Sequence, residues 1–346
     1  MSIPLSVLDL APVATDTTAV QALHNSIALA RSVDQLGYKR YWLAEHHNIP
    51  SIAVSTPEIM IARIAQETAH MRIGSGGMML PNHAPLRVAE LFTTLEALYP
   101  GRIDLGIGRA PGTDPLTVYA LRQSRERMNM RDFPRQLSEL VGFGQSDLQG
   151  NALPVSNPLH AIRTVPNGVV LPPIWLLGSS REFSAKLAGA RGFSFAFAYH
   201  INPVLADAVA AMESYRRYFR PSAQQSTPMS LLAVSVLCAD TREEVEAQAT
   251  VLDLAFVRRQ RGEVTPLPSL AEAQNYAFTE VEQAQAQEAR ARMLMGEPRI
   301  VHEQIAQLVD TTGANEIAVA VTVADHAARL RTYQLLATAF ALQWAG

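Results

Sequence analysis

Apolar and polar positions follow two alternating rhythms along the chain. Short apolar runs typical of buried strands are each followed by a longer segment in which apolar residues recur every three or four positions, as they do on one face of a helix. Strands are therefore predicted at residues 3–8, 41–44, 71–80, 103–108, 173–177, 193–198, 231–238 and 316–319. Helices are predicted at residues 19–37, 59–69, 88–98, 133–141, 180–190, 203–219, 242–258, 299–311 and 326–342.

Eight strands that alternate with helices predict a (β/α)8 TIM barrel, an α/β fold in which ligands gather at the C-terminal ends of the strands. Two segments interrupt the rhythm. Residues 142–170, rich in Gly, Asn and Pro, are expected to form a long connection. Residues 259–292, rich in Ala, Glu and Gln, are expected to form a helical excursion before the last strand–helix unit. We expect residues 1–346 to form a single barrel domain, and an open doubly wound sheet is the alternative architecture.

Composition and charge narrow the class of protein. The chain of 346 residues is 48% hydrophobic, so it can bury a large core. Its 29 basic and 32 acidic residues are scattered, so no electropositive stripe predicts nucleic acid binding. No apolar stretch reaches the roughly 18 residues of a membrane-spanning helix, and the N-terminus lacks a signal-peptide pattern. The single cysteine, Cys238, suits a reducing compartment. We therefore expect a cytoplasmic protein that binds neither nucleic acid nor membrane.

A polar cluster, Ala44-Glu45-His46-His47-Asn48, directly follows the second predicted strand and so lies at the expected mouth of the barrel. Adjacent residues of an extended segment point to opposite sides, so His46 and His47 cannot easily bind one metal ion, and no metal site is expected. The cluster either orients a loop and accepts protons beside a cofactor, or has a hydrogen-bonded structural role.

Glycines interrupt the next two predicted strands, where glycine weakens a strand. The run Gly74-Ser75-Gly76-Gly77 indicates either that a planar ring comes close to the backbone or that the strand bulges. The later glycines Gly106, Gly108 and Gly112 match the dinucleotide fingerprint only superficially, because the third comes one residue late and follows a proline. Arg109, at the end of that strand, either reaches a phosphate or forms a surface ion pair.

The turn Gly178-Ser179-Ser180 lies between a predicted strand and a predicted helix. Such a turn presents amide donors and hydroxyl groups to an anion at a helix N-terminus. Ordinary helix capping uses the same residues, so both interpretations stay open.

Together these segments are similar in order and spacing to the bacterial luciferase-like flavin monooxygenases. The similarity spans nearly the whole chain and is carried by AEHHN at residues 44–48, GSGGMMLPNHAPL at 74–86, LYPGRIDLGIGRAPGTD at 98–114 and WLLGSS at 175–180. The chain resembles the small bacterial luciferase-like oxidoreductases more than the light-emitting subunits, which carry a cysteine where this chain has Gly108.

The resemblance implies that reduced FMN lies across the strand ends, with Gly76 and Gly77 packing on its isoalloxazine through a cis peptide bond. The residues matched to the cofactor site are Ser75, Gly76, Gly77, Arg109, Gly178, Ser179, Ser180, Ala198 and Tyr199. Of these, Arg109 and the two serines would receive the phosphate, and Ala198 and Tyr199 would line the other side of the flavin. Glu45 and His46 are the catalytic candidates, with His46 as the proton-transfer group.

The leading functional hypothesis is a flavin-dependent monooxygenase that uses reduced FMN and molecular oxygen to oxidise a small organic substrate. A separate flavin reductase is expected, because the sequence shows no nicotinamide fingerprint. One alternative is an oxidoreductase that transfers hydride with the deazaflavin coenzyme, and another is a flavin-binding protein without turnover. The family also implies a homodimer, packed through helices within residues 53–69 and 86–98.

Overall fold

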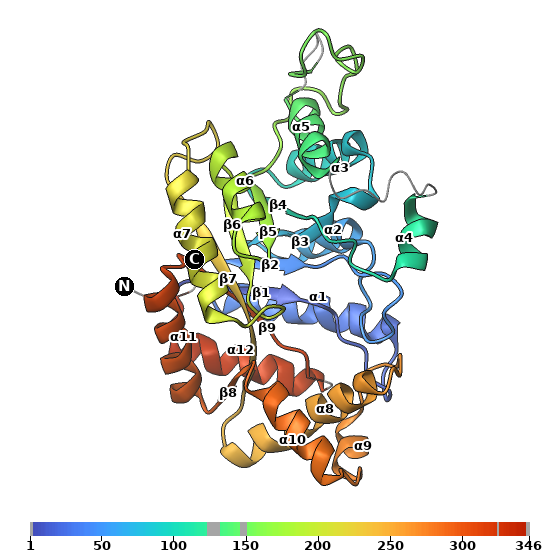
Figure 1. Cartoon of the computed structure of the whole chain (residues 1–346), viewed down its shortest axis with the longest axis vertical. Coiled ribbons are helices and arrows are strands. Elements are labelled where there is room, and N and C mark those ends of the chain that lie inside the picture. The colour runs from blue at the N-terminus through green and yellow to red at the C-terminus, as the bar shows by residue number, and fades with distance from the viewer. Residues whose placement is uncertain (1–2, 123–131, 146–150, 324, 344–346) are drawn as a thin grey trace.

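A computed structural model describes residues 3–122, 132–145, 151–323 and 325–343. Within them, parallel strands form a closed barrel surrounded by helices (Figure 1). The eight barrel strands are β1 (Leu5–Asp9), β2 (Arg40–Leu43), β3 (Arg72–Met79), β4 (Ile103–Gly108), β5 (Ile174–Gly178), β6 (Ser194–Ala198), β7 (Ser230–Cys238) and β9 (Glu316–Ala320). The pairings of β1 with β9, β9 with β7 and β7 with β6 close the ring. The predicted (β/α)8 barrel is therefore confirmed, and an open sheet is excluded.

Helices follow the strands and cover the outside of the barrel (Figure 1). They are α1 (Ala19–Gln35), α2 (Pro57–Glu67), α3 (Pro85–Leu98), α4 (Pro115–Arg122), α5 (Phe133–Phe143), α6 (Phe183–Arg191), α7 (Leu205–Tyr218), α8 (Arg242–Gln260), α9 (Leu270–Gln274), α10 (Glu280–Arg290), α11 (Pro298–Thr312) and α12 (His326–Ala339), with a 3-10 turn, η1 (Leu80–Asn82), after β3. Left-handed glycines, Gly192 and Gly313, end α6 and α11. In the described part of the chain, no helix combines the length and apolarity needed to cross a membrane.

Besides the 3-10 turn η1, one helix and one strand of the described structure were not predicted. Helix α4 follows Asp114, whose side chain accepts hydrogen bonds from the amides of Leu116 and Thr117, and it has proline in its first position. Asp followed by Pro is a helix-start signal, so α4 could have been found from the sequence. The strand β8 (Leu294–Gly296) has only three residues and pairs with the end of β7 outside the barrel ring. It is too short to produce a periodic signal.

The predicted start of one helix at Ser180 is wrong. Helix α6 begins at Phe183, so the Gly178-Ser179-Ser180 turn precedes the helix rather than opening it. The side-chain amide of Asn202 donates to the Ser179 carbonyl at 2.8 Å. This bond ties the turn to the loop after β6, and the backbone enters the helix only three residues later.

The segment 259–292 is largely helical, as predicted, and it packs against the loop after β1. The Leu267 amide donates to the Val13 carbonyl and the Thr15 amide donates to the Leu267 carbonyl, both at 2.9 Å. Helix α9 packs against α8 through a small separate apolar cluster that includes Leu254 and Ala273, whereas α10 is joined to α8 by the ion pairs of Arg290 with Glu246 and Asp253. The segment thus forms a wall on the side where the barrel strands end.

The strands show the period of two that a barrel requires, since one face packs on the helices and the other fills the interior. The interior residues form one cluster, which comprises Leu8, Trp42, Ala44, Trp175, Ala196, Leu231, Ala233, Ala318 and Ala320. Trp42 and Trp175 meet edge to face with ring centroids 5.1 Å apart. These two large rings fill the middle of the barrel, and mostly alanine lies around them.

Buried charges close the N-terminal end of the barrel. The Arg40 guanidinium bonds to the carboxylates of Asp104 at 2.7 Å and Glu316 at 2.8 Å, and Arg72 bonds to Asp104 at 2.7 Å. The Arg40 guanidinium also lies 4.8 Å from the centre of the Trp175 ring. We call Arg40, Asp104 and Glu316 the charged floor. Ligands therefore have access to the barrel only from the C-terminal ends of the strands.

Candidate active site

The sequence-predicted site residues lie at the C-terminal ends of five strands. Glu45 and His46 follow β2, Ser75-Gly76-Gly77 lie in β3, and Arg109 follows β4. The Gly178-Ser179-Ser180 turn ends β5, and Ala198 and Tyr199 end β6. Because all strands of the barrel are parallel, these residues share one rim.

Glu45 is a buried carboxylate whose two oxygens accept several hydrogen bonds. The Met79 amide donates at 2.7 Å, the Nε2 atoms of His47 and His83 at 2.8 and 3.0 Å, and the Asn82 side-chain amide at 3.3 Å. Burial on its own would raise the pKa of Glu45, but the hydrogen bonds from His47 and His83 outweigh it and lower the pKa to about 2. Glu45 therefore stays charged at neutral pH and ties the loops after β2 and β3 together.

His83 and Asn82 were not singled out from the sequence, although both lie within the motif after the glycine run. Burial lowers the pKa of His83, but its hydrogen bond to Glu45 more than compensates and raises it. Across the described residues, no group of three or more His, Cys, Asp or Glu side chains has the arrangement of a metal site. The Glu45, His47 and His83 group is joined by hydrogen bonds instead.

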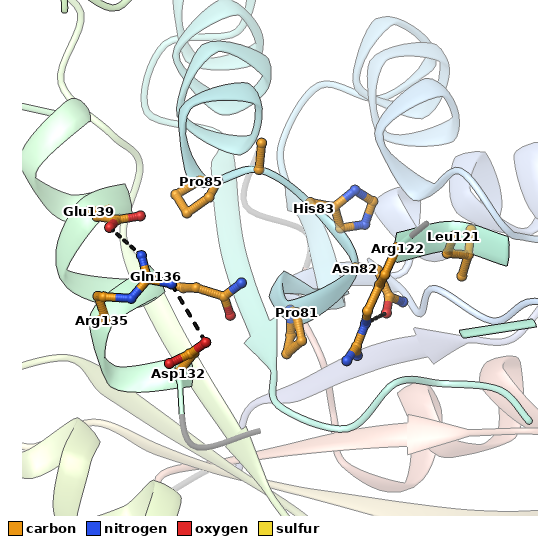
Figure 2. A pocket seen from close by; sticks show the side chains of 11 residues that line it. Pro81, Asn82, His83, Pro85, Leu121, Arg122, Asp132, Arg135, Gln136 and Glu139 are labelled. Carbon is orange, nitrogen blue, oxygen red and sulfur yellow. Dashed lines mark hydrogen bonds and ion pairs between the residues drawn. The ribbon is translucent and has the colours of Figure 1, made fainter. Parts of the chain in front are cut away.

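A cavity of about 240 Å³ lies beside this hydrogen-bonded group, between η1, α4 and α5 (Figure 2). Arg135 on its wall is already paired with Asp132 and Glu139. The lining comprises Pro81, Asn82, His83, Ala84, Pro85, Leu121, Arg122, Asp132, Arg135, Gln136 and Glu139. None of the sequence-predicted cofactor residues lines it, so this cavity adjoins the candidate site without being its centre.

The glycine run forms a bulge in β3. The peptide bond between Gly76 and Gly77 is cis, as the resemblance implied. The pairing of β3 with β4 skips from Ser75 to Met78. A bulge, which was one of the two interpretations of the glycine run, is therefore present. A Cβ atom added at Gly76 would lie 2.9 Å from Cβ of Trp42, which shows that the backbone packs closely on the barrel interior. The hydroxyl group of Ser75 donates to the Gly106 carbonyl at 2.8 Å.

Arg109 packs against the start of the helix that follows the turn after β5. The Arg109 guanidinium is 4.2 Å from the centre of the Phe183 ring, and Phe183 is the first residue of α6. Arg109 has no carboxylate partner within the described residues, so the surface ion pair considered from the sequence is not found among them. Arg109 is half-buried, and Phe183 follows the Gly178–Ser180 turn by three residues, so the Arg109 guanidinium is a candidate to bind an anion together with that turn.

Two histidines, His46 and His200, lie at the barrel rim near enough for His46 to act electrostatically on His200. Burial lowers the pKa of His46, and its Nδ1 atom is buried without a hydrogen-bond partner among the described residues. His200 directly follows Tyr199, and its Nδ1 lies 3.4 Å from the Ala233 carbonyl. Burial, together with nearby His46, lowers the pKa of His200 to about 4. His200 was missed from the sequence because the motif reading stopped one residue earlier.

Comparisons with known proteins identify the family of the chain. The family described as luciferase-like monooxygenase matches residues 3–338. The uncharacterized protein YvbT of Bacillus subtilis is 43% identical over 333 residues, which cover 96% of this chain and 95% of that protein. The luciferase-like monooxygenase of Escherichia coli K12 is 39% identical over 334 residues, which cover 96% of both.

Comparison with solved structures shows the same fold. The crystal structure of apo-MsnO8 has a TM-score of 0.86 and 37% identity, and the match covers 99% of both chains. More distant structures share the fold: an FMN complex of 3,6-diketocamphane monooxygenase from Pseudomonas putida, with a TM-score of 0.72, 19% identity and 97% of both chains covered, and an F420-dependent secondary alcohol dehydrogenase, with a TM-score of 0.68, 15% identity and 98% and 99% covered. The chain therefore belongs to the luciferase-like monooxygenase family, and it is an oxidoreductase.

Proposed function

We propose that the protein is an FMN-dependent monooxygenase that uses reduced FMN and molecular oxygen to oxidise a small organic substrate. The observation that carries the proposal is the contact of Arg109 with Phe183, the first residue of the helix that follows the Gly178–Ser180 turn, with no carboxylate partner of Arg109 in the described structure. The donors of Arg109 and of that turn fit a flavin phosphate. The family and the FMN complex of a distant relative support the same cofactor.

The rim of the barrel offers a place for each part of FMN. Arg109 and the amides and hydroxyl groups of Gly178, Ser179 and Ser180 would hold the phosphate. Gly76 and Gly77 would lie against one face of the isoalloxazine, and Ala198 and Tyr199 against the other. The buried side chains of Ala44, Ala198 and Ala233 are small, so they would present little steric hindrance to a planar ring placed beside them. Bound reduced FMN would supply the electrons that activate oxygen.

The residues of the chain itself supply proton handling and water exclusion. His46 is proposed as the proton acceptor, because burial favours its neutral form, which retains a free ring lone pair. Glu45 does not act on the substrate in this scheme. Instead, its hydrogen bonds fix the position of the loop that carries His46. The apolar lining of the interior keeps the space around the rings poor in water.

The first experiment measures oxygen consumption by the protein with photoreduced FMN and a panel of small organic substrates. Substrate-dependent oxygen consumption with formation of an oxygenated product is the expected result. Tight FMN binding without any change in flavin reoxidation would contradict the proposal and favour non-catalytic binding. Hydride transfer with the deazaflavin coenzyme and none of these activities with FMN would favour the deazaflavin alternative.

The Arg109→Ala variant tests the phosphate contact. Loss of a charge-assisted bond of about 1.5–3 kcal/mol should weaken FMN binding by roughly 10-fold to 100-fold. Riboflavin, which lacks the phosphate, should bind the variant nearly as well as the wild type. Fluorescence titration measures both affinities, and Arg299→Ala on the exposed surface of α11 is the matched control. An equal loss for FMN and riboflavin would refute the phosphate role.

The remaining expectations concern partners. We propose a separate flavin reductase as the source of reduced FMN, a homodimer as the assembly, and the cytoplasm as the location. These proposals extend the family resemblance.

A further inference from the structure

The two histidines at the barrel mouth lie at the ends of opposite strands. His46 follows β2 and His200 follows β6. In the closed ring, three strands separate β2 from β6 on either side, namely β3, β4 and β5 on one and β7, β9 and β1 on the other. The two residues therefore lie across the mouth from each other, and they are near enough for His46 to act electrostatically on His200.

Among the described residues, each imidazole ring keeps one nitrogen without a hydrogen-bond partner. Nδ1 of His46 is buried and has no hydrogen-bond partner in the described part of the chain. Nδ1 of His200 lies near the Ala233 carbonyl, which can only accept a hydrogen bond, so this contact favours the tautomer with the proton on Nδ1. Nε2 of His200 is then an unprotonated acceptor, and it has no partner among the residues that the structure describes.

The charged and titratable groups around His46 and His200 do not favour the state in which both rings are protonated and positively charged. His46 is flanked by the Glu45 carboxylate and by His47, and the pKa of His46 is lowered by burial. Glu45 is already engaged by His47 and His83. The titratable group that acts on His200 is His46 itself, and it opposes protonation of His200. Two imidazolium rings would repel each other in this buried setting.

We propose that His200 is a second proton-handling residue of the site, and that His46 and His200 together hold at most one proton. This inference rests on the proposed function for its role in turnover. When the pair takes a proton from a hydroxyl or amine group of the substrate, the new N–H bond forms on one ring and the electron pair stays with the substrate. The second ring remains neutral, and the proton then leaves to water.

A titration of the nine histidines followed by nitrogen-15 NMR tests the pair without any turnover. In the wild type at pH 7, Nε2 of His200 should show the shift of an unprotonated ring nitrogen. In His46→Asn, the protonation midpoint of His200 should rise by about half a pH unit or more, because a like charge no longer opposes it. His24→Asn, on the exposed face of α1, should leave that midpoint unchanged. A protonated Nε2 at pH 7, or an unchanged midpoint in His46→Asn, would overturn the proposal.

Turnover gives a second readout. Each single variant, His46→Asn and His200→Asn, should lower kcat by about 10²-fold to 10⁴-fold, as is typical when a proton-transfer group is lost. The double variant should lose much less than the product of the two single effects, because the residues act as one unit. Additive losses, or a normal kcat and pH profile in His200→Asn, would contradict the pair. If the wild type does not consume oxygen, the proposed function fails, while the NMR result still decides whether the rings share a proton.

Discussion

At the scale of single residues, Glu45 shows how one carboxylate organises a site. It is fully buried, and its donors come from the loop after β2 and the turn after β3. A buried charge is tolerated only when hydrogen bonds replace the water it has lost. The carboxylate therefore holds two loops at fixed positions relative to the strand ends.

The charge of Glu45 predicts a pH-dependent stability. Its pKa in the folded protein is about 2, against an ordinary value of 4.5, so its contribution is fully present above about pH 5 and is lost as the pH falls toward 2. The shift corresponds to roughly 3 kcal/mol. Glu45→Gln should lose about that much free energy of unfolding at pH 6 and should depend less on pH down to pH 3.5, as measured by urea denaturation.

The control for this prediction is Glu288→Gln, which changes an exposed carboxylate on α10. It should leave the free energy of unfolding and its pH dependence unchanged. The measurements stay at or below pH 6 because the raised pKa of His83 makes an opposite contribution, present at low pH and lost as the pH rises above about 6.5. A Glu45→Gln variant as stable as the wild type would show that the carboxylate is not needed.

Local pattern revealed some site residues and hid others. Glu45, Arg109 and Gly178 stand directly at strand ends inside conspicuous motifs, so their placement followed from the barrel. The hydrogen bond of His83 to Glu45 spans 38 residues, and the approach of His200 to His46 depends on closure of the ring. Neither relation has a signature in the local sequence.

At the scale of elements, the contact between β3 and β4 depends on glycine. A Cβ atom at Gly106 would lie 2.0 Å from the backbone oxygen of Ser75, which cannot move without breaking the strand pairing. The periodicity that predicted both strands could not show this close approach, because it depends on how neighbouring strands pack.

Gly106→Ala should therefore destabilise the protein by about 2–3 kcal/mol or more, as overpacking of a rigid site does. Urea denaturation measures the loss. The matched control is Gly168→Ala, where φ is +76° and nothing lies within 4 Å, so only backbone strain of about 1 kcal/mol is expected. Equal losses in the two variants would rule out a specific clash at Gly106.

Helix α10 should open independently of the barrel. Its start is fixed by a capping box in which Thr279 accepts from the Glu282 amide and the Glu282 carboxylate accepts from the Thr279 amide. Thr279→Ala should cost about 1 kcal/mol and speed proteolytic cleavage within residues 261–292 roughly fivefold. The urea midpoint of the barrel should stay the same. Thr338→Ala, at the exposed end of α12, should leave the cleavage rate unchanged, and the same rate in both variants would contradict the prediction.

At the scale of the whole molecule, the ring of strands was predictable because eight alternating units leave few alternatives to closure. The number of subunits could not be predicted in the same way, because single apolar residues are common on the surfaces of monomers as well as of oligomers. Ile59 on α2 and Leu98 on α3 are 64% and 62% exposed, and both lie in the helices expected to pair in a homodimer.

Ile59→Glu and Leu98→Glu should convert a dimer into monomers, because a buried unpaired charge opposes association. Sedimentation velocity measures the change. Val281→Glu, at a site on α10 that is 67% exposed, should leave the dimer intact. A wild-type chain that sediments as a monomer, or a dimer that tolerates both charges, would disprove this interface.

The charged floor has a consequence for the order of events in turnover. Since Arg40, Asp104 and Glu316 close one end and the tryptophan rings fill the middle, ligands can reach the barrel only from the C-terminal ends of the strands. If cofactor and substrate both bind at this end, the one nearer the tryptophan rings must enter before the other and leave after it. Steady-state kinetics should thus follow a strictly ordered sequential mechanism, because the outer ligand blocks the release of the inner one.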